Sequence, residues 1–235
     1  MRKAWLIAWR EITWEILGDR GALLRQGVFL LLPVGFVLAN RGAPPGRLDG
    51  LLVTLAAQSV LLPAISGVAL IASTFVAEKE NGTLVPLLAA PIRDLDIVVG
   101  KLLGMLIPVT AIALLSLAVF YAVATATFGT AAMQRALTPQ LLYALMVVAL
   151  LYLLTTGSWV MVVAARVRTS RGAQQISGLL IAGGLFVFAT LGALFSQLLD
   201  GYGLVGLGLL FLATDLLAIE IARRGWQRGE VVARL

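Results

Sequence analysis

The chain has 235 residues, of which 60% are hydrophobic and 13% charged, and its formal net charge is +6. Soluble domains hold about 45–50% apolar and about 25% charged residues, so this composition indicates an integral membrane protein whose basic residues flank membrane spans and do not bind nucleic acid. Because His and Cys are absent and neither a P-loop nor a G-x-S-x-G motif occurs, we expect no enzyme, no metal site and no cofactor on this chain.

Residues 1–17 have the pattern of an amphipathic helix that lies in the membrane interface. Trp5, Trp9, Ile12 and Ile16 recur on one helical face, and tryptophan is enriched at headgroup depth. The charged residues lie elsewhere on the helical wheel: Lys3, Arg10, Glu11 and Glu15. An ordinary cytosolic extension is the alternative.

Six apolar segments follow, and a helix needs about 20 apolar residues to cross a bilayer. The loop after the first segment, residues 41–50, is rich in Pro and Gly and is expected to be a turn. Residues 127–140 are expected to form another loop, with one charge, Arg135. We therefore predict a single domain over residues 1–235, an all-α membrane protein with six transmembrane helices. The predicted spans cover residues 22–40, 51–77, 98–126, 141–165, 174–196 and 204–222.

The distribution of Lys and Arg along the chain indicates its orientation. Fifteen of the 18 fall in the N-terminal segment, the segment around the start of the third span, the loop after the fourth span and the C-terminal tail. The other three, Arg41, Arg47 and Arg135, fall in the loops between these segments. Since cytoplasmic loops carry the excess of Lys and Arg, we expect a multi-pass protein of the inner (plasma) membrane with both termini in the cytoplasm.

Residues 78–97, between the second and third spans, form a charged segment of the kind that binds another protein. Asn81 and Gly82 can end the second helix, and Thr83 can cap a new short one. Pro91 disfavours helix at the residue before it and closes the element. We therefore predict a short helix on the cytoplasmic side.

Leu84, Leu87 and Leu88 fall at i, i+3 and i+4 of this short helix and make one apolar stripe. Charged residues border the stripe: Glu78, Glu80, Arg93, Asp94 and Asp96. An apolar stripe with a charged rim is typical of a docking surface. Packing of the same helix on the underside of the protein itself is the alternative.

The third span begins with two further local features. Asp94 is its expected N-cap, because Asp favours that position. Gly100-x-x-x-Gly104 would let another helix approach closely, since neither residue has a side chain.

Residues 75–101 also carry a specific order of residues: Phe75, Glu78-Lys79-Glu80-Asn81-Gly82-Thr83-Leu84, Leu87-Leu88, Pro91 and Gly100-Lys101. This order resembles the E-x-E-x-G-T-L…LL…P…GK signature of type 2 ABC exporter permeases, which also lies between spans two and three. The interfacial N-terminal helix, the six spans and the cytoplasmic termini resemble the same family in architecture.

The resemblance implies a permease that pairs as a dimer, here a homodimer, and docks two cytoplasmic ATPase subunits that bind ATP and Mg²⁺. The short helix would be a coupling helix seated in a groove of the ATPase. Closure of the ATPases would then switch the permease between inward-facing and outward-facing states. The implied coupling residues are Glu78, Glu80, Asn81, Gly82, Thr83, Leu84, Leu87 and Leu88. The residues implied in a second cytoplasmic contact are Arg166, Arg168 and Arg171.

Asp215 lies inside the predicted sixth span. A carboxylate at the centre of a membrane helix costs about 2.5–3.5 kcal/mol, so it should face the bundle interior or water. Asp215 is therefore a cation or proton site, a group that lines the translocation path, or a hydrogen-bonded packing residue near Thr214.

Together these features predict the membrane-spanning permease subunit of an ATP-driven ABC exporter, which moves an apolar or amphipathic substrate by alternating access. Two alternatives stay open: a haem-exporter-type permease of cytochrome maturation, and an ion-coupled secondary transporter that uses Asp215. An intramembrane enzyme is disfavoured, because the sequence offers no His, no Cys and no convincing pair of buried carboxylates.

Overall fold

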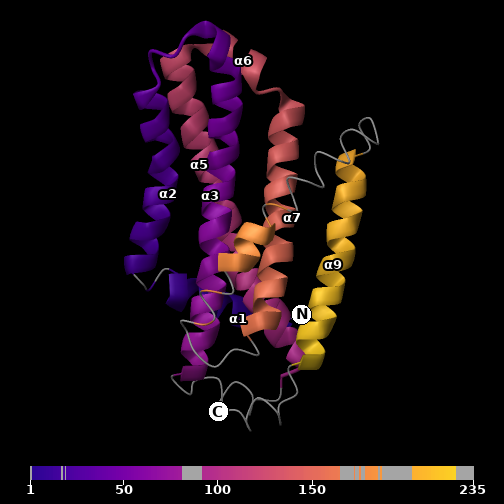
Figure 1. Ribbon diagram of the computed structural model, residues 1–235. Helices are drawn as coiled ribbons and strands as arrows, with labels where there is room; N and C mark the ends of the chain where they lie inside the picture. The colour runs from indigo at the N-terminus through magenta and orange to yellow at the C-terminus, as the bar shows by residue number, and fades with distance from the viewer. Residues whose placement is uncertain are drawn as a thin grey trace.

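The computed structural model describes residues 2–16, 18, 20–80, 92–164, 172, 175, 178–184, 186 and 203–225. Within these residues all regular structure is helical, as the sequence predicts, and the long helices run side by side (Figure 1). Residues 178–184 form a further short helical stretch. The other elements are α1 (Arg2–Arg10), the π-helical segment η1 (Glu11–Ile16), α2 (Arg20–Ala39), α3 (Pro45–Glu80), α5 (Asp94–Phe128), α6 (Thr130–Ala136), α7 (Pro139–Ala164) and α9 (Gly203–Gly225).

Among the described residues, three helices are long and apolar enough to cross a membrane: Pro45–Val68 in α3, Leu95–Phe128 in α5 and Pro139–Val163 in α7. α2 contains a shorter apolar stretch, Gly27–Ala39. α9 coincides with the predicted sixth span, whereas most of the predicted fifth span, residues 174–196, lies outside the described residues. The all-helical membrane class is confirmed, and the count of six spans stays a prediction.

α3 begins at Pro45, so the prediction of a loop over residues 41–50 is wrong in its second half. Proline is favoured at the first helical position, because its missing N–H has no helical partner there and its fixed φ suits the helix. The Arg47 amide donates to the Pro44 carbonyl at 3.0 Å. The connection from α2 to α3 is therefore shorter than its composition suggests.

The predicted loop at residues 127–140 contains a helix, α6. Gly129 makes the corner between α5 and α6 with a φ of 87°, a conformation that favours glycine. Met133 is fully buried, together with Ala132 and Ala136, in a cluster with side chains of α2, α3 and α5. The loop prediction is wrong because these apolar side chains gain partners that exist only in the folded bundle.

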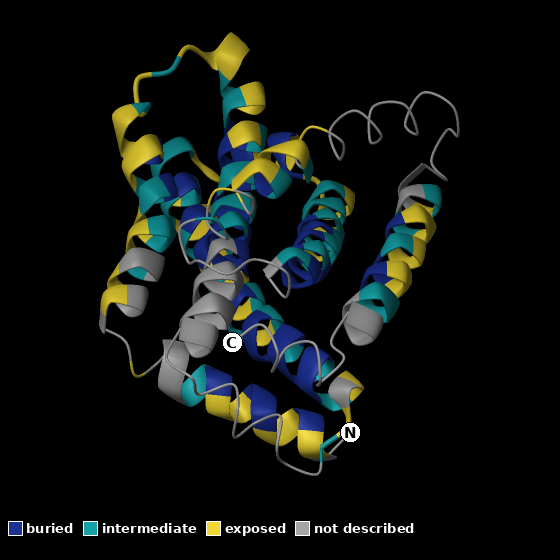
Figure 2. Cartoon of the chain, turned by 60° about the horizontal axis from the view of Figure 1, so that its bottom comes forward, coloured by how far each residue is buried: buried dark blue, intermediate teal, exposed yellow. Residues whose placement is uncertain are grey.

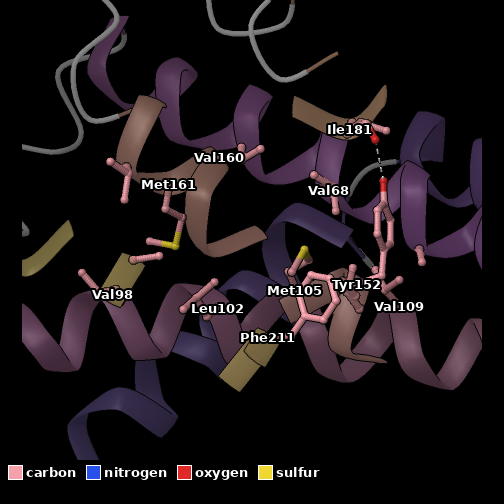
Figure 3. Packing of buried hydrophobic residues seen from close by; sticks show 14 of the residues in the cluster. Val68, Val98, Leu102, Met105, Val109, Tyr152, Val160, Met161, Ile181 and Phe211 are labelled. Atoms are coloured by element: carbon pink, nitrogen blue, oxygen red, sulfur yellow. Dashed lines mark hydrogen bonds between the residues drawn. The ribbon is translucent and has the colours of Figure 1, made fainter. Parts of the chain in front are cut away.

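α3 occupies the middle of the bundle, where it packs against α2, α5 and α7. It lies very close to α5 at Gly67, where a Cβ atom would overlap the side chain of Val109. A large apolar cluster joins α3, α5, α7 and α9, and Met105, Tyr152 and Phe211 belong to it (Figure 3). α9 is attached to the bundle mainly through α7.

The two ends of the bundle differ in what covers them. α1 lies across the end where α3 and α7 finish and α5 begins (Figures 1 and 2). α6 and the α2–α3 connection lie at the opposite end (Figure 1). Arg41, Arg47 and Arg135 belong to that opposite end, so the fold separates them from α1, as their positions in the sequence predict.

Candidate functional site

The structure describes the two helices that come directly before and after the predicted coupling region. α3 runs to Glu80, so the backbone at Glu78 and Glu80 is helical. α5 starts again at Asp94, at the same end of the bundle (Figure 1). The remaining predicted coupling residues lie outside the described residues: Asn81, Gly82, Thr83, Leu84, Leu87 and Leu88. The same holds for the predicted second contact at Arg166, Arg168 and Arg171.

The N-cap of α5 is Arg93, and the prediction that Asp94 fills this position is wrong by one residue. Arg93 is extended, with φ −75° and ψ 143°, and no side chain caps the helix there. Its carbonyl accepts the first helical hydrogen bonds, from the amides of Asp96 at 2.9 Å and Ile97 at 3.3 Å. Those bonds make Asp94 the first residue inside the helix.

α1 lies directly on the first turns of α5, and the two glycines of α5 make this possible. A Cβ atom at Gly100 would lie 2.8 Å from the carbonyl oxygen of Ala4, and one at Gly104 would lie 3.2 Å from that of Ala8. Ala4 and Ala8 are themselves small and buried. The predicted close approach at Gly100-x-x-x-Gly104 is thus confirmed, and its partner is the N-terminal helix.

A buried ion pair lies in this same contact. The Nζ atom of Lys101 lies 3.0 Å from Oε1 of Glu11, and the two side chains are 4% and 9% exposed. Lys101 is part of the Gly100-Lys101 pair that ends the sequence signature, whereas Glu11 was expected on the polar side of an interfacial helix. The ion pair with Lys101 of α5 offsets the cost of burying Glu11, because a charge in an apolar contact needs an opposite charge.

The outer face of α1 is apolar and aromatic. Trp5 and Trp9 are 50% and 56% exposed, and their ring centroids lie 6.4 Å apart. The opposite face, with Ile7 and Ala8, is buried against α5. α1 therefore packs on the bundle and does not project from it as a free extension, while its position in a membrane interface stays a prediction.

Asp215, the predicted intramembrane polar residue, is 2% exposed. Within the described part of the chain, neither of its carboxylate oxygens has a hydrogen-bond partner. Thr155 of α7 approaches this carboxylate, but its Oγ1 atom also stays outside hydrogen-bonding geometry. The neighbouring Thr214 hydroxyl donates instead to the Phe211 carbonyl of its own helix at 2.8 Å.

A cavity of about 390 Å³ lies between α7, residues 178–184 and α9. Tyr152, Thr155 and Trp159 line it from α7, and Phe211 lines it from α9. The Tyr152 hydroxyl donates to the carbonyl of Ile181 at 3.2 Å, which ties α7 to the short helical stretch (Figure 3). Sequence analysis missed this cavity, because its walls come from three segments whose proximity no local pattern reports.

Comparison with known proteins identifies the family. The model of a family described as ABC-2 family transporter protein matches residues 40–213, well over half of the chain. The match runs from the end of α2 into α9, so it includes the predicted coupling region. A search of curated proteins finds no match. The chain is therefore a member of the ABC-2 family of transporter proteins, and the resemblance seen in its sequence is confirmed.

Proposed function

We propose that this membrane permease works as the transport subunit of an ATP-driven exporter, with a separate cytoplasmic ATPase and a second copy of itself. One observation carries the proposal. The family match covers residues 40–213, and inside it the order E-x-E-x-G-T-L falls between two membrane-length helices, α3 and α5. Members of this family generally pair with a cytoplasmic ATPase.

The contacts of α5 suggest how a movement of the coupling region would be transmitted to the rest of the protein. Residues 78–97 end in the first turn of α5, whose next turns are joined to α1 at Gly100, Lys101 and Gly104. A force on the region would therefore move α5 together with α1.

ATP and Mg²⁺ belong to the partner in this proposal, since the chain contains no P-loop. The excess of Lys and Arg at the α1 end supports a cytoplasmic position for that end and for both termini, in an inner (plasma) membrane. The cavity beside α7 is lined mostly by apolar side chains, which supports an apolar or amphipathic substrate.

The test is the double variant Glu78→Lys/Glu80→Lys, reconstituted in liposomes with the ATPase that co-purifies with the tagged wild-type chain. Reversal of both charges at the rim of the coupling region should lower ATP hydrolysis to the rate of the ATPase alone and stop transport. Asp49→Lys is the matched control, because Asp49 is an exposed carboxylate of α3 at the opposite end of the bundle.

ATP hydrolysis and transport that are unchanged in the double variant would rule out the coupling role. Transport that survives removal of ATP but stops when an ion gradient is collapsed would instead identify an ion-coupled secondary transporter. A chain that hydrolyses ATP without any partner would contradict the division of labour between the two subunits.

A further inference from the structure

We propose that the cavity between α7, residues 178–184 and α9 binds an organic cation with an apolar body, and that the buried carboxylate of Asp215, which lies behind the cavity wall beside Thr155, is the negative charge that attracts it. As a binding site, this inference rests on the described residues alone. As the substrate class of the exporter, it also rests on the proposed function. The two claims are separable, because binding needs no ATPase.

The hydroxyl groups around the cavity are mostly engaged as donors. The Thr156 hydroxyl donates to the Tyr152 carbonyl at 2.7 Å, and the Tyr152 hydroxyl donates to the Ile181 carbonyl at 3.2 Å. The Thr214 hydroxyl donates to the Phe211 carbonyl. No Lys or Arg is among the described residues that line the cavity. An anion would therefore find no cation among these residues, and its hydrogen-bond donors would be limited to the Thr155 hydroxyl and the Trp159 indole N–H.

Acceptor atoms, in contrast, are left over beside the cavity. Both carboxylate oxygens of Asp215 and the Oγ1 atom of Thr155 are buried without a hydrogen bond within the described residues. Thr155 lines the cavity and approaches Asp215, so the carboxylate lies next to the cavity wall at this point. An unpaired carboxylate in apolar surroundings is costly, and a cation in the cavity would remove that cost.

The size and lining of the cavity favour an organic cation over a metal ion. About 390 Å³ falls in the range of roughly 300–1,000 Å³ that is usual for small-molecule pockets, whereas a water molecule occupies only about 30 Å³. Tyr152, Trp159 and Phe211 line the cavity with apolar area, and aromatic rings attract cations that lie over their faces. The described residues contain no group of three or more His, Cys, Asp or Glu that could hold a metal ion.

The experiment measures binding of radiolabelled tetraphenylphosphonium to the purified full chain in nanodiscs. We expect saturable binding of this cation and, in a separate measurement, no saturable binding of radiolabelled tetraphenylborate, which has nearly the same shape and the opposite charge. Asp215→Asn keeps the shape of the side chain and removes its charge, so it should weaken binding by at least about tenfold. Glu220→Gln makes the same change on the same helix away from the cavity, and it should bind as wild type does.

A second variant fills the cavity and leaves the charge in place. Gly183 lines the cavity, and a Cβ atom there would meet nothing within 4 Å, so the side chain of Gly183→Leu starts in open space. It should abolish binding while the protein elutes from size exclusion as wild type does. Gly35→Leu is its matched control, because Gly35 lies in α2 with equally open space around it.

Three results would overturn the assignment: saturable binding of tetraphenylborate when it is measured alone, wild-type affinity in Asp215→Asn, or wild-type affinity in Gly183→Leu. If Asp215→Asn does not fold, Gly183→Leu decides the question. Failure of the binding test leaves the coupling of α5 to an ATPase untouched, and failure of the coupling test leaves the binding result untouched.

Discussion

Lys101 and Glu11 connect two parts of the chain that are 90 residues apart in sequence. Removing two charges from water is expensive, and their attraction offsets that cost only while both partners are present. Loss of either side chain leaves an unpaired charge inside the contact between α1 and α5. We therefore expect the pair to help fix where α1 lies on α5 more than to add net stability.

Replacement of Lys101 by Ala is expected to lower the free energy of unfolding by about 3–5 kcal/mol, because Glu11 stays buried without its partner. The double variant Glu11→Gln/Lys101→Met should recover most of this loss, since neither side chain then carries a charge. Denaturant unfolding of the purified single and double variants in detergent micelles measures both effects.

The control is Arg135→Ala, which removes an exposed cation of α6 and should unfold as wild type does. An equal loss in the single Lys101→Ala variant and in the double variant would show that the two charges do not depend on one another. In that case the 3.0 Å contact would have no energetic role.

At the scale of elements, the position of α1 depends on the absence of side chains at Gly100 and Gly104. Gly104→Leu is expected to push α1 away from α5, because its Cβ atom alone would lie 2.7 Å from the Cβ of Glu11 and 3.2 Å from the carbonyl oxygen of Ala8. Overpacking of this kind costs about 1–3 kcal/mol. The backbone atom of Ala8 cannot rotate away, so the whole helix has to shift.

A single introduced cysteine reports this shift, because the chain contains no cysteine of its own. Ala8 is fully buried against α5, so the thiol of Ala8→Cys should resist maleimide in an otherwise wild-type chain. The same thiol should react when Gly104→Leu is added, and it should stay protected when Gly35→Leu is added instead. Protection in all three backgrounds would show that α1 does not depend on Gly104 for its position.

The elements that the sequence predicts well are those whose signal is local. α5, α7 and α9 fall close to their predicted spans, because the length of an apolar run is a property of the run itself. α6 and the burial of Glu11 were not predicted, because both depend on partners distant in the sequence. The start of α3 at Pro45 was missed for a different reason, since proline suits a turn and a first helical position equally well.

The candidate functional residues likewise divide into those that have a local signal in the sequence and those that do not. Residues 75–101 are recognisable from the order of their residues, and Lys101 is part of that order. Its partner Glu11 could have been suspected from one signal, since a lysine with apolar neighbours on both sides in a membrane-length helix needs an opposite charge nearby. The cavity had no such signal, because residues 178–184 and the facing parts of α7 and α9 look like ordinary apolar helix.

At the scale of the whole molecule, the fold places two chemically different ends on one bundle. α1 covers the end where α5 begins, while Arg41, Arg47 and Arg135 belong to the end with α6 (Figure 1). The proposed coupling requires the α1 end to face the cytoplasm, because ATP and the ATPase are found there. Orientation in the membrane is therefore the property on which the transport mechanism depends.

Cysteine labelling of intact cells tests this orientation with two matched positions. Arg47 is exposed near the start of α3, and Leu95 is 45% exposed near the start of α5, so each should yield an accessible thiol when replaced by Cys. A membrane-impermeant maleimide should label Arg47→Cys in intact cells, and it should label Leu95→Cys only after lysis, because Lys and Arg are in excess at the cytoplasmic end. The reverse pattern would place residues 78–97 outside the cytoplasm, where no ATPase could contact them, and the proposed coupling would then be impossible.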